Sequence, residues 1–183
     1  MNNFLPIAAI CFVGLGFAVW VIGMLLPRQV TASRTTELKA SQARIFETVT
    51  NIEKQTEWRK DITSVTVHPS GKSWTEKTTA GIFIDFEVRH KEPNSRFEIE
   101  FAFKQGFSGY WVGVFLPSSN GTMVQITETI EIKSRIFRVI SRIFGFTEKF
   151  IDTYLTQLKE AVENQSDIAT SDDGDARGDR SRV

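Results

Sequence analysis

The stretch that most constrains this chain is a predicted amphipathic helix near its C-terminus, from Thr147 to Glu163. Its apolar residues recur at helical spacing, and polar residues occupy the opposite side. The stripe consists of Phe150, Ile151, Tyr154, Leu155, Leu158 and Val162. A stripe of this length has to be covered, so the helix predicts a long apolar surface elsewhere in the chain.

The segments before this helix alternate like β-strands and supply that surface. The pattern is clearest over residues 96–104, where Phe97, Ile99, Phe101 and Phe103 alternate with polar residues. Hairpin-length turns separate the strands, as at Asn120-Gly121. We predict strands over residues 31–39, 62–68, 73–79, 82–90, 96–104, 106–116 and 122–133.

Two short helices are predicted between the first two strands. Ser41 is a suitable N-cap, and the first helix ends near Asn51. Residues 55–61, around Trp58, form a second helical turn. The predicted fold class is therefore α+β, with a seven-stranded curved antiparallel sheet wrapped on one long helix. Such a sheet need not fill the space that it encloses.

The N-terminal residues 4–26 form an apolar run of about 23 positions without a charge, long enough to cross a hydrocarbon core of roughly 30 Å. The alternative is a signal peptide cut after Val30-Thr31-Ala32. The run is longer than an ordinary signal core and no Lys or Arg precedes it, so we predict a retained transmembrane anchor over residues 1–30. Basic residues follow the run, which predicts a single-pass protein of the cell membrane with a cytoplasmic domain.

Charge and composition exclude several partner classes. Lys+Arg and Asp+Glu each total 22, so no basic excess indicates nucleic acid. The single Cys11 excludes an intramolecular disulfide, and His68 and His90 lack partners at ligand spacing, so we predict no metal and no cofactor. Residues 166–183 are almost devoid of apolar side chains, which predicts a disordered polar tail after a domain at 31–165.

Several local strings match a known superfamily. They are Leu26-Pro27-Arg28, residues 34–40 leading into Ile45-Phe46, Asn51-Ile52-Glu53, Glu57-Trp58, and residues 121–126 and 154–159. They resemble the SRPBCC superfamily (START-like, polyketide cyclase/dehydrase and lipid transport), in a membrane-anchored bacterial variant. The resemblance covers about residues 33–164. It implies a helix-grip fold with a cavity for an apolar ligand. One departure is Gln55, where many relatives carry an aromatic residue.

Aromatic side chains on the predicted inner faces are the first candidates for binding a ligand. Core packing explains any one of them, but together, in a chain with 15 Phe, they favour a hydrophobic cavity. They are Trp74, Phe86, Phe101, Phe103, Trp111, Phe150 and Tyr154.

Glu128 is a further candidate, because it occupies the apolar phase of its strand between Ile126 and Ile130. An unpaired carboxylate there is costly, and burial raises its pKa. Two interpretations remain open. Glu128 either bonds a ligand hydroxyl or acts as a general base, or it is paired with an Arg or hydrated where the cavity opens.

Residues 133–146 combine arginines with apolar residues at helical spacing, a composition suited to the headgroup layer of an anionic membrane. The alternative is that this segment is the first part of the gripped helix, broken at Gly145. The predicted membrane-contact residues are Arg135, Phe137, Arg138, Arg142 and Phe144.

Three functions are compatible with these features. The first is a membrane-tethered module that binds a lipid, quinone or isoprenoid without covalent chemistry. The second is a cyclase- or hydrolase-type enzyme that uses Glu128 with Tyr110 or Tyr154 as acid and base. The third is a regulatory domain with a filled core that binds another protein. No nucleophile elbow, phosphate-binding glycine loop or paired-carboxylate motif is present, so we assign no catalytic residue.

Overall fold

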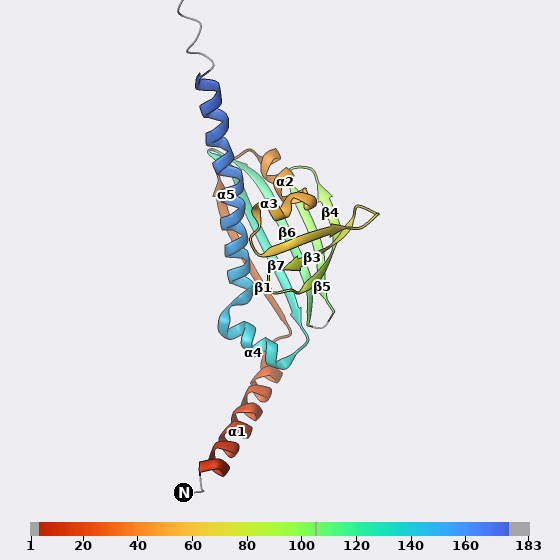
Figure 1. The fold of residues 1–183 in the computed structure, drawn as a ribbon, viewed down its shortest axis with the longest axis vertical. Coiled ribbons are helices and arrows are strands. Elements are labelled where there is room, and N and C mark those ends of the chain that lie inside the picture. The colour runs from red at the N-terminus through yellow and green to blue at the C-terminus, as the bar shows by residue number, and fades with distance from the viewer. Residues whose placement is uncertain (1–3, 105, 176–183) are drawn as a thin grey trace, which may run out of the picture.

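One antiparallel sheet dominates the computed structural model, which describes residues 4–104 and 106–175, with side chains for 13–104 and 106–163. The seven strands follow the order β1-β7-β6-β5-β4-β3-β2 (Figure 1). The predicted α+β class and seven-stranded sheet are confirmed. The strands are β1 (Gln29–Leu38), β2 (Ile62–Val67), β3 (Ser73–Thr78), β4 (Phe83–Glu92), β5 (Arg96–Phe103), β6 (Phe107–Ser118) and β7 (Gly121–Ile132).

Each strand from β2 to β6 pairs with the strand that follows it in the chain, and β1 pairs with β7. At the predicted Pro69-Ser70-Gly71 turn, the N–H of Gly71 donates to the carbonyl of His68 at 2.9 Å, and Gly71 has a φ of +66°. The register of β4 on β5 shifts between Val88 and His90. Such bulges increase strand twist, which helps the sheet to curve.

Helices α2, α3 and α5 cover one face and one end of this sheet. α2 (Gln42–Thr50) begins at the predicted N-cap, since the Ser41 hydroxyl accepts from the N–H of Arg44 at 3.3 Å. A short η1 (Ile52–Lys54) and α3 (Gln55–Trp58) follow it. The long α5 (Phe146–Asp175) runs along the sheet beside β1 (Figure 1). Its backbone extends past residue 165, the predicted end of the domain, and the tail residues 176–183 lie outside the described residues.

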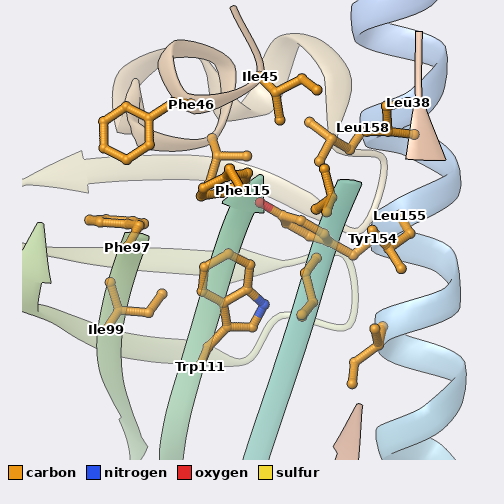
Figure 2. Close-up of a cluster of buried hydrophobic side chains, with 14 of the residues drawn as sticks. Leu38, Ile45, Phe46, Phe97, Ile99, Trp111, Phe115, Tyr154, Leu155 and Leu158 are labelled. Carbon is orange, nitrogen blue, oxygen red and sulfur yellow. The ribbon is translucent and has the colours of Figure 1, made fainter. Parts of the chain in front are cut away.

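Apolar side chains fill the end of the interior that lies under α2. Leu38, Ile45, Phe115 and Leu158 are fully buried there. Figure 2 shows Leu158 and Tyr154 extending from α5 towards the strands that carry Phe115 and Trp111. The hydrophobic stripe predicted for the C-terminal helix is therefore covered as expected at this end.

Two glycines of β6 make room for aromatic rings against the inner face of the sheet. A Cβ at Gly109 would lie 2.2 Å from the carbonyl oxygen of Thr129 and 2.7 Å from the Phe101 ring. A Cβ at Gly113 would lie 2.6 Å from the ring of Trp111. These approaches place large rings directly over the backbone, which sets the shape of the concave face.

Residues 135–144 form a separate helix, α4 (Arg135–Phe144), and are not the first part of α5. Gly145 ends α4 with a φ of +60°, and its N–H donates to the carbonyl of Ser141. α4 packs against the N-terminal helix α1 (Phe4–Leu25), and both lie at the opposite end of the sheet from α2 and α3 (Figure 1).

The predicted transmembrane anchor falls only in part on described side chains. Among the residues that the structure describes, no helix is long and apolar enough to cross a membrane. Residues 1–3 and the side chains of residues 4–12, which begin the predicted anchor, lie outside that description.

We expect Gly109→Ala to lower the free energy of unfolding by about 1–3 kcal/mol, because the added methyl meets a backbone carbonyl and the Phe101 ring. Urea unfolding followed by tryptophan fluorescence measures the change. Ser108→Ala, on the other face of β6, is the control and should shift stability by less than about 0.5 kcal/mol. Equal, small effects of both changes would contradict this account of the inner face.

Candidate functional site

A cavity of about 310 Å³ occupies the part of the interior that the core leaves unfilled. Apolar side chains make up most of its wall, and four aromatic residues outside the predicted ligand-binding set also belong to it: Phe97, Phe107, Phe137 and Phe146. Phe103, predicted as a lining residue, is not part of the wall, because its ring packs on Phe107 with centroids 5.5 Å apart. The other predicted residues do meet there: Trp74, Phe86, Phe101, Trp111, Glu128, Phe150 and Tyr154.

The positions along β7 and α5 at which side chains change from lining the cavity to filling the core locate its closed end. On β7, Val124 and Ile126 are fully buried in the core, whereas Glu128, Ile130 and Ile132 line the cavity. On α5, the lining residues run from Phe146 to Tyr154, and Leu158 and Val162 belong to the core. On these two elements the lining therefore stops at Glu128 and Tyr154, about 12 Å along the helix axis from Phe146, and Val49 of α2 and Phe97 of β5 complete the closed end.

The other end opens at the corner between α4 and α5. Phe137, Phe146 and Phe150 all line the cavity, yet 36%, 43% and 38% of their respective surfaces remain exposed. Side chains that line the cavity and are also exposed at the protein surface mark the mouth of the cavity. An aromatic mouth of this kind suits the passage of an apolar ligand.

A buried ionic cluster forms part of the wall. The Arg59 guanidinium donates to both Glu76 carboxylate oxygens at 2.9 and 3.1 Å, to Asp61 at 2.6 Å and to the Gln55 side chain at 2.7 Å. The indole N–H of Trp74 donates to Glu76 at 2.9 Å. Each member has a partner inside the cluster, which is what allows charges to be buried here.

The cluster fixes the charge of Arg59. Burial opposes the charged guanidinium, but the nearby Glu76 and Asp61 carboxylates outweigh burial and raise the pKa of Arg59. Arg59 therefore stays cationic at every physiological pH. Its guanidinium also lies 5.7 Å from the centre of the Tyr154 ring, at the closed end of the cavity.

Glu128 is the exception among these polar groups. Its Oε2 is buried and has no hydrogen-bond partner among the described residues. Burial raises the pKa of Glu128 to about 8, and the charge of Arg59 offsets only part of that rise. The carboxyl is therefore mainly protonated at neutral pH. The predicted pairing of Glu128 with an Arg is not found, since the guanidinium of Arg59 bonds to Glu76 and Asp61.

The two tyrosines named as acid–base candidates lie in different places. Tyr154 lines the cavity, and burial raises the pKa of its hydroxyl, so it stays protonated. Tyr110 is on the outer face of the sheet, 43% exposed, with the Arg89 guanidinium 4.4 Å from its ring centre. Tyr110 therefore cannot act inside the cavity. Within the described part of the chain, no group of His, Cys, Asp and Glu side chains is placed to hold a metal ion.

Sequence reasoning missed Arg59 and Glu76. A signal for Glu76 was present, because it shares the inner phase of its strand with Trp74, as Glu128 does with Ile126. Arg59 lies in a loop after α3, and nothing in the local pattern indicates that it turns inward. Only the need of a buried Glu76 for a cation could have suggested it.

The arginines of α4 contact α1 at the mouth. Arg138 is buried and donates to the carbonyl of Leu26 at 2.9 Å, and the Arg135 guanidinium lies 4.8 Å from the centre of the Trp20 ring. A Cβ at Gly23 would lie 2.5 Å from the carbonyl oxygen of Arg135, so the two helices touch closely. Of the three predicted membrane-contact arginines, Arg135 contacts α1, Arg138 bonds to the residue that follows α1, and Arg142 is exposed.

Solved structures share this fold. No protein-family model and no curated protein matches the chain. A START superfamily protein from Mycobacterium smegmatis aligns with a TM-score of 0.59 at 18% identity, covering 74% of this chain and 98% of that one. An uncharacterised protein from Rhizobium leguminosarum aligns with a TM-score of 0.56 at 18% identity, covering 74% and 95%.

A third structure is the di-domain ARO/CYC StfQ from the steffimycin biosynthetic pathway. It aligns with a TM-score of 0.59 at 14% identity, covering 75% of this chain and 52% of StfQ. These similarities show the fold alone. At that level they confirm the START-like fold that the sequence strings predicted.

We expect Glu128→Gln to stabilise the fold at alkaline pH. Below its ordinary pKa of 4.5 the carboxyl is protonated in both the folded and the unfolded chain. Above that pH the unfolded chain ionises first, so stability falls until about pH 8, where the folded carboxyl also ionises. At pH 9 the variant should exceed the wild type by about 2–4 kcal/mol, and at pH 4 by less than about 1 kcal/mol.

Urea unfolding at the two pH values measures this difference. Glu131→Gln is the matched control, because Glu131 lies on the same strand and is exposed. An advantage of Glu128→Gln that is the same at pH 4 and pH 9 would show that the carboxyl has the same pKa in the folded and the unfolded chain, so that burial does not raise it.

Proposed function

We infer that this chain, with its START-like fold, is a membrane-tethered module that binds one hydrophobic ligand, such as a lipid, quinone or isoprenoid. The observation that carries the proposal is the cavity of about 310 Å³, walled mainly by aromatic and aliphatic side chains and open at an aromatic mouth. Each Å² of apolar ligand surface buried there contributes about 25 cal/mol. The volume lies at the lower end of the usual range for small-molecule sites.

The state of the polar groups supports binding over catalysis. Arg59, Glu76 and Asp61 are bonded to one another, and the Tyr154 hydroxyl does not ionise near neutral pH. The alternative enzyme of the cyclase or hydrolase kind then depends on Glu128 as the acid or base, since its pKa of about 8 suits proton transfer. A single carboxyl without a second catalytic group is a weak basis for such chemistry.

Helix α1 supports the tether. The described residues alone do not qualify as a span, but the full sequence of α1, with residues 4–12 included, has 22 residues without a charge, and a helix of that length spans about 33 Å at 1.5 Å per residue. It projects away from the domain (Figure 1). We therefore propose a single-pass anchor in the cell membrane, with the domain on the cytoplasmic side because basic residues follow the span.

Helix α4 is the part of the domain that we place at the membrane surface. Its side chains Ile136, Ile143 and Phe144 are 57%, 71% and 53% exposed, although they are apolar. Because Arg135 and Arg138 hold α4 on α1, the apolar face and the cavity mouth lie next to the end of the anchor. A ligand could then move between bilayer and cavity without crossing water.

We expect the purified full-length chain to retain an extractable apolar molecule, detected by mass spectrometry of a solvent extract. Ile130→Trp fills the cavity from β7 and should reduce the bound amount at least tenfold, because the indole occupies the ligand's space. Glu131→Trp, on the exposed side of the same strand, should retain the ligand. An extract without any stoichiometric apolar molecule, from a folded protein that also binds no added one, would refute the binding function.

We expect the chain to stay in the membrane fraction during alkaline carbonate washing. Replacing Val13 and Phe17 with Arg should release it, because each arginine costs about 2.5–3.5 kcal/mol at the centre of an inserted helix. Gln125→Arg, on the exposed surface of β7, is the control and should remain bound. Release of the unmodified chain would remove the tether from the proposal and leave the cavity function intact.

A further inference from the structure

We propose that the cavity takes a single-chain amphiphile head first, with a neutral hydroxyl head hydrogen-bonded to Glu128 at the closed end and the tail directed to the α4–α5 mouth. This inference rests on the proposed binding function and names the class of ligand. It follows from the position of Glu128, from its free hydrogen-bonding capacity and from the charges around it.

The position of Glu128 sets the orientation of the ligand. Ile130 and Ile132 continue the cavity wall from Glu128 towards the mouth, whereas Ile126 on its other side is fully buried in the core. A head group at Glu128 therefore reaches the closed end. A chain longer than about 12 Å leaves its tail among the exposed rings of Phe146 and Phe150.

Glu128 has a buried carboxyl oxygen at the closed end whose bonding capacity the described residues leave unused. Gln55, Arg59 and Glu76 also line the cavity, but they bond to one another. The Oε2 of Glu128 is buried without a partner, and burying a polar atom in that state is costly. A ligand head that supplies the missing bond removes this cost.

The chemistry of Glu128 selects the head group. A protonated carboxyl both donates and accepts a hydrogen bond, and a hydroxyl is the simple head that does the same. An anionic head would meet the Glu76 carboxylate in addition to Glu128, and Arg59 is already bonded to Glu76 and Asp61. A cationic head would have to ionise Glu128 and lie near Arg59, whose positive charge repels it.

Binding of a labelled alcohol to the full-length chain in phospholipid nanodiscs tests the inference. The measured quantity is radiolabelled dodecanol retained above that in empty nanodiscs, with labelled dodecane, dodecanoate and dodecylamine compared under the same conditions. At pH 6.5 we expect dodecanol to bind best. Glu128→Leu should weaken dodecanol binding by about three- to tenfold and leave dodecane unchanged, since only the head-group bond is lost.

Two further variants keep this test specific. Glu128→Gln should bind dodecanol within about twofold of the wild type, because an amide also donates and accepts. Glu131→Gln, on the exposed side of β7, is the matched control and should behave as the wild type.

Raising the pH from 6.5 to 9.5 should weaken dodecanol binding to the wild type by about three- to tenfold and leave Glu128→Gln unchanged, because ionised Glu128 no longer donates. The charged and titratable groups that share the cavity with Glu128 are Arg59 after α3, Glu76 on β3 and Tyr154 on α5. Arg59 stays charged and Tyr154 stays protonated through this interval.

The outcomes separate this inference from the function on which it rests. Equal binding of dodecane and dodecanol, with no effect of Glu128→Leu, would overturn the head-group assignment and leave the binding function standing. Tighter binding of dodecylamine or dodecanoate would overturn the assignment in favour of a charged head. Binding of none of the four molecules would refute the binding function itself.

Discussion

The packing of α5 against the curved sheet is the interaction on which the rest of this structure depends. At one end, Leu158 and Val162 of α5 meet side chains from α2 and β7, and the interior is closed. The edge-to-face contact of Trp111 with Tyr154, 5.7 Å between ring centres, marks where this filling stops. Beyond it lies the cavity, walled by side chains of the sheet and of α5 that leave about 310 Å³ between them unfilled.

Two buried carboxyls in the same wall show how strongly surroundings decide the charge of a group. Glu76 lies within hydrogen-bond distance of Arg59 and the Trp74 indole, so its negative charge is compensated. Glu128 lies at a comparable depth without such a partner, and burial raises its pKa to about 8. The first carboxylate belongs to the structural frame of the cavity. The second is the group that a ligand can still use, which is why the ligand class follows from Glu128.

The contact between α1 and α4 connects the cavity to the proposed tether. Arg138 satisfies the carbonyl of Leu26 at the end of α1, where a helix leaves its last carbonyls without internal partners. Arg135 stacks on Trp20 and brings the two helices into close contact. With α4 held in this way, the exposed side chains of Phe137 and Phe146 lie at both the domain surface and the cavity mouth. Helix α1, helix α4 and the cavity mouth are therefore neighbours at one end of the domain.

The sequence by itself determined the elements of this protein. Period-two alternation such as Phe97, Ile99 and Phe101, and the helical stripe around Tyr154, are local patterns, so the strands and the long helix could be predicted. The cavity wall was largely predictable for the same reason. The START-like fold came from the resemblance of local strings to a known superfamily. Only the tertiary structure decided that Arg59 turns inward to Glu76, that Tyr110 faces outward, and that Phe107 lines the cavity while Phe103 packs beside it. Only the tertiary structure showed that Arg135 and Arg138 of α4 contact the N-terminal segment instead of facing outward. Those outcomes depend on which partner lies across the interior, and that partner comes from a distant part of the chain.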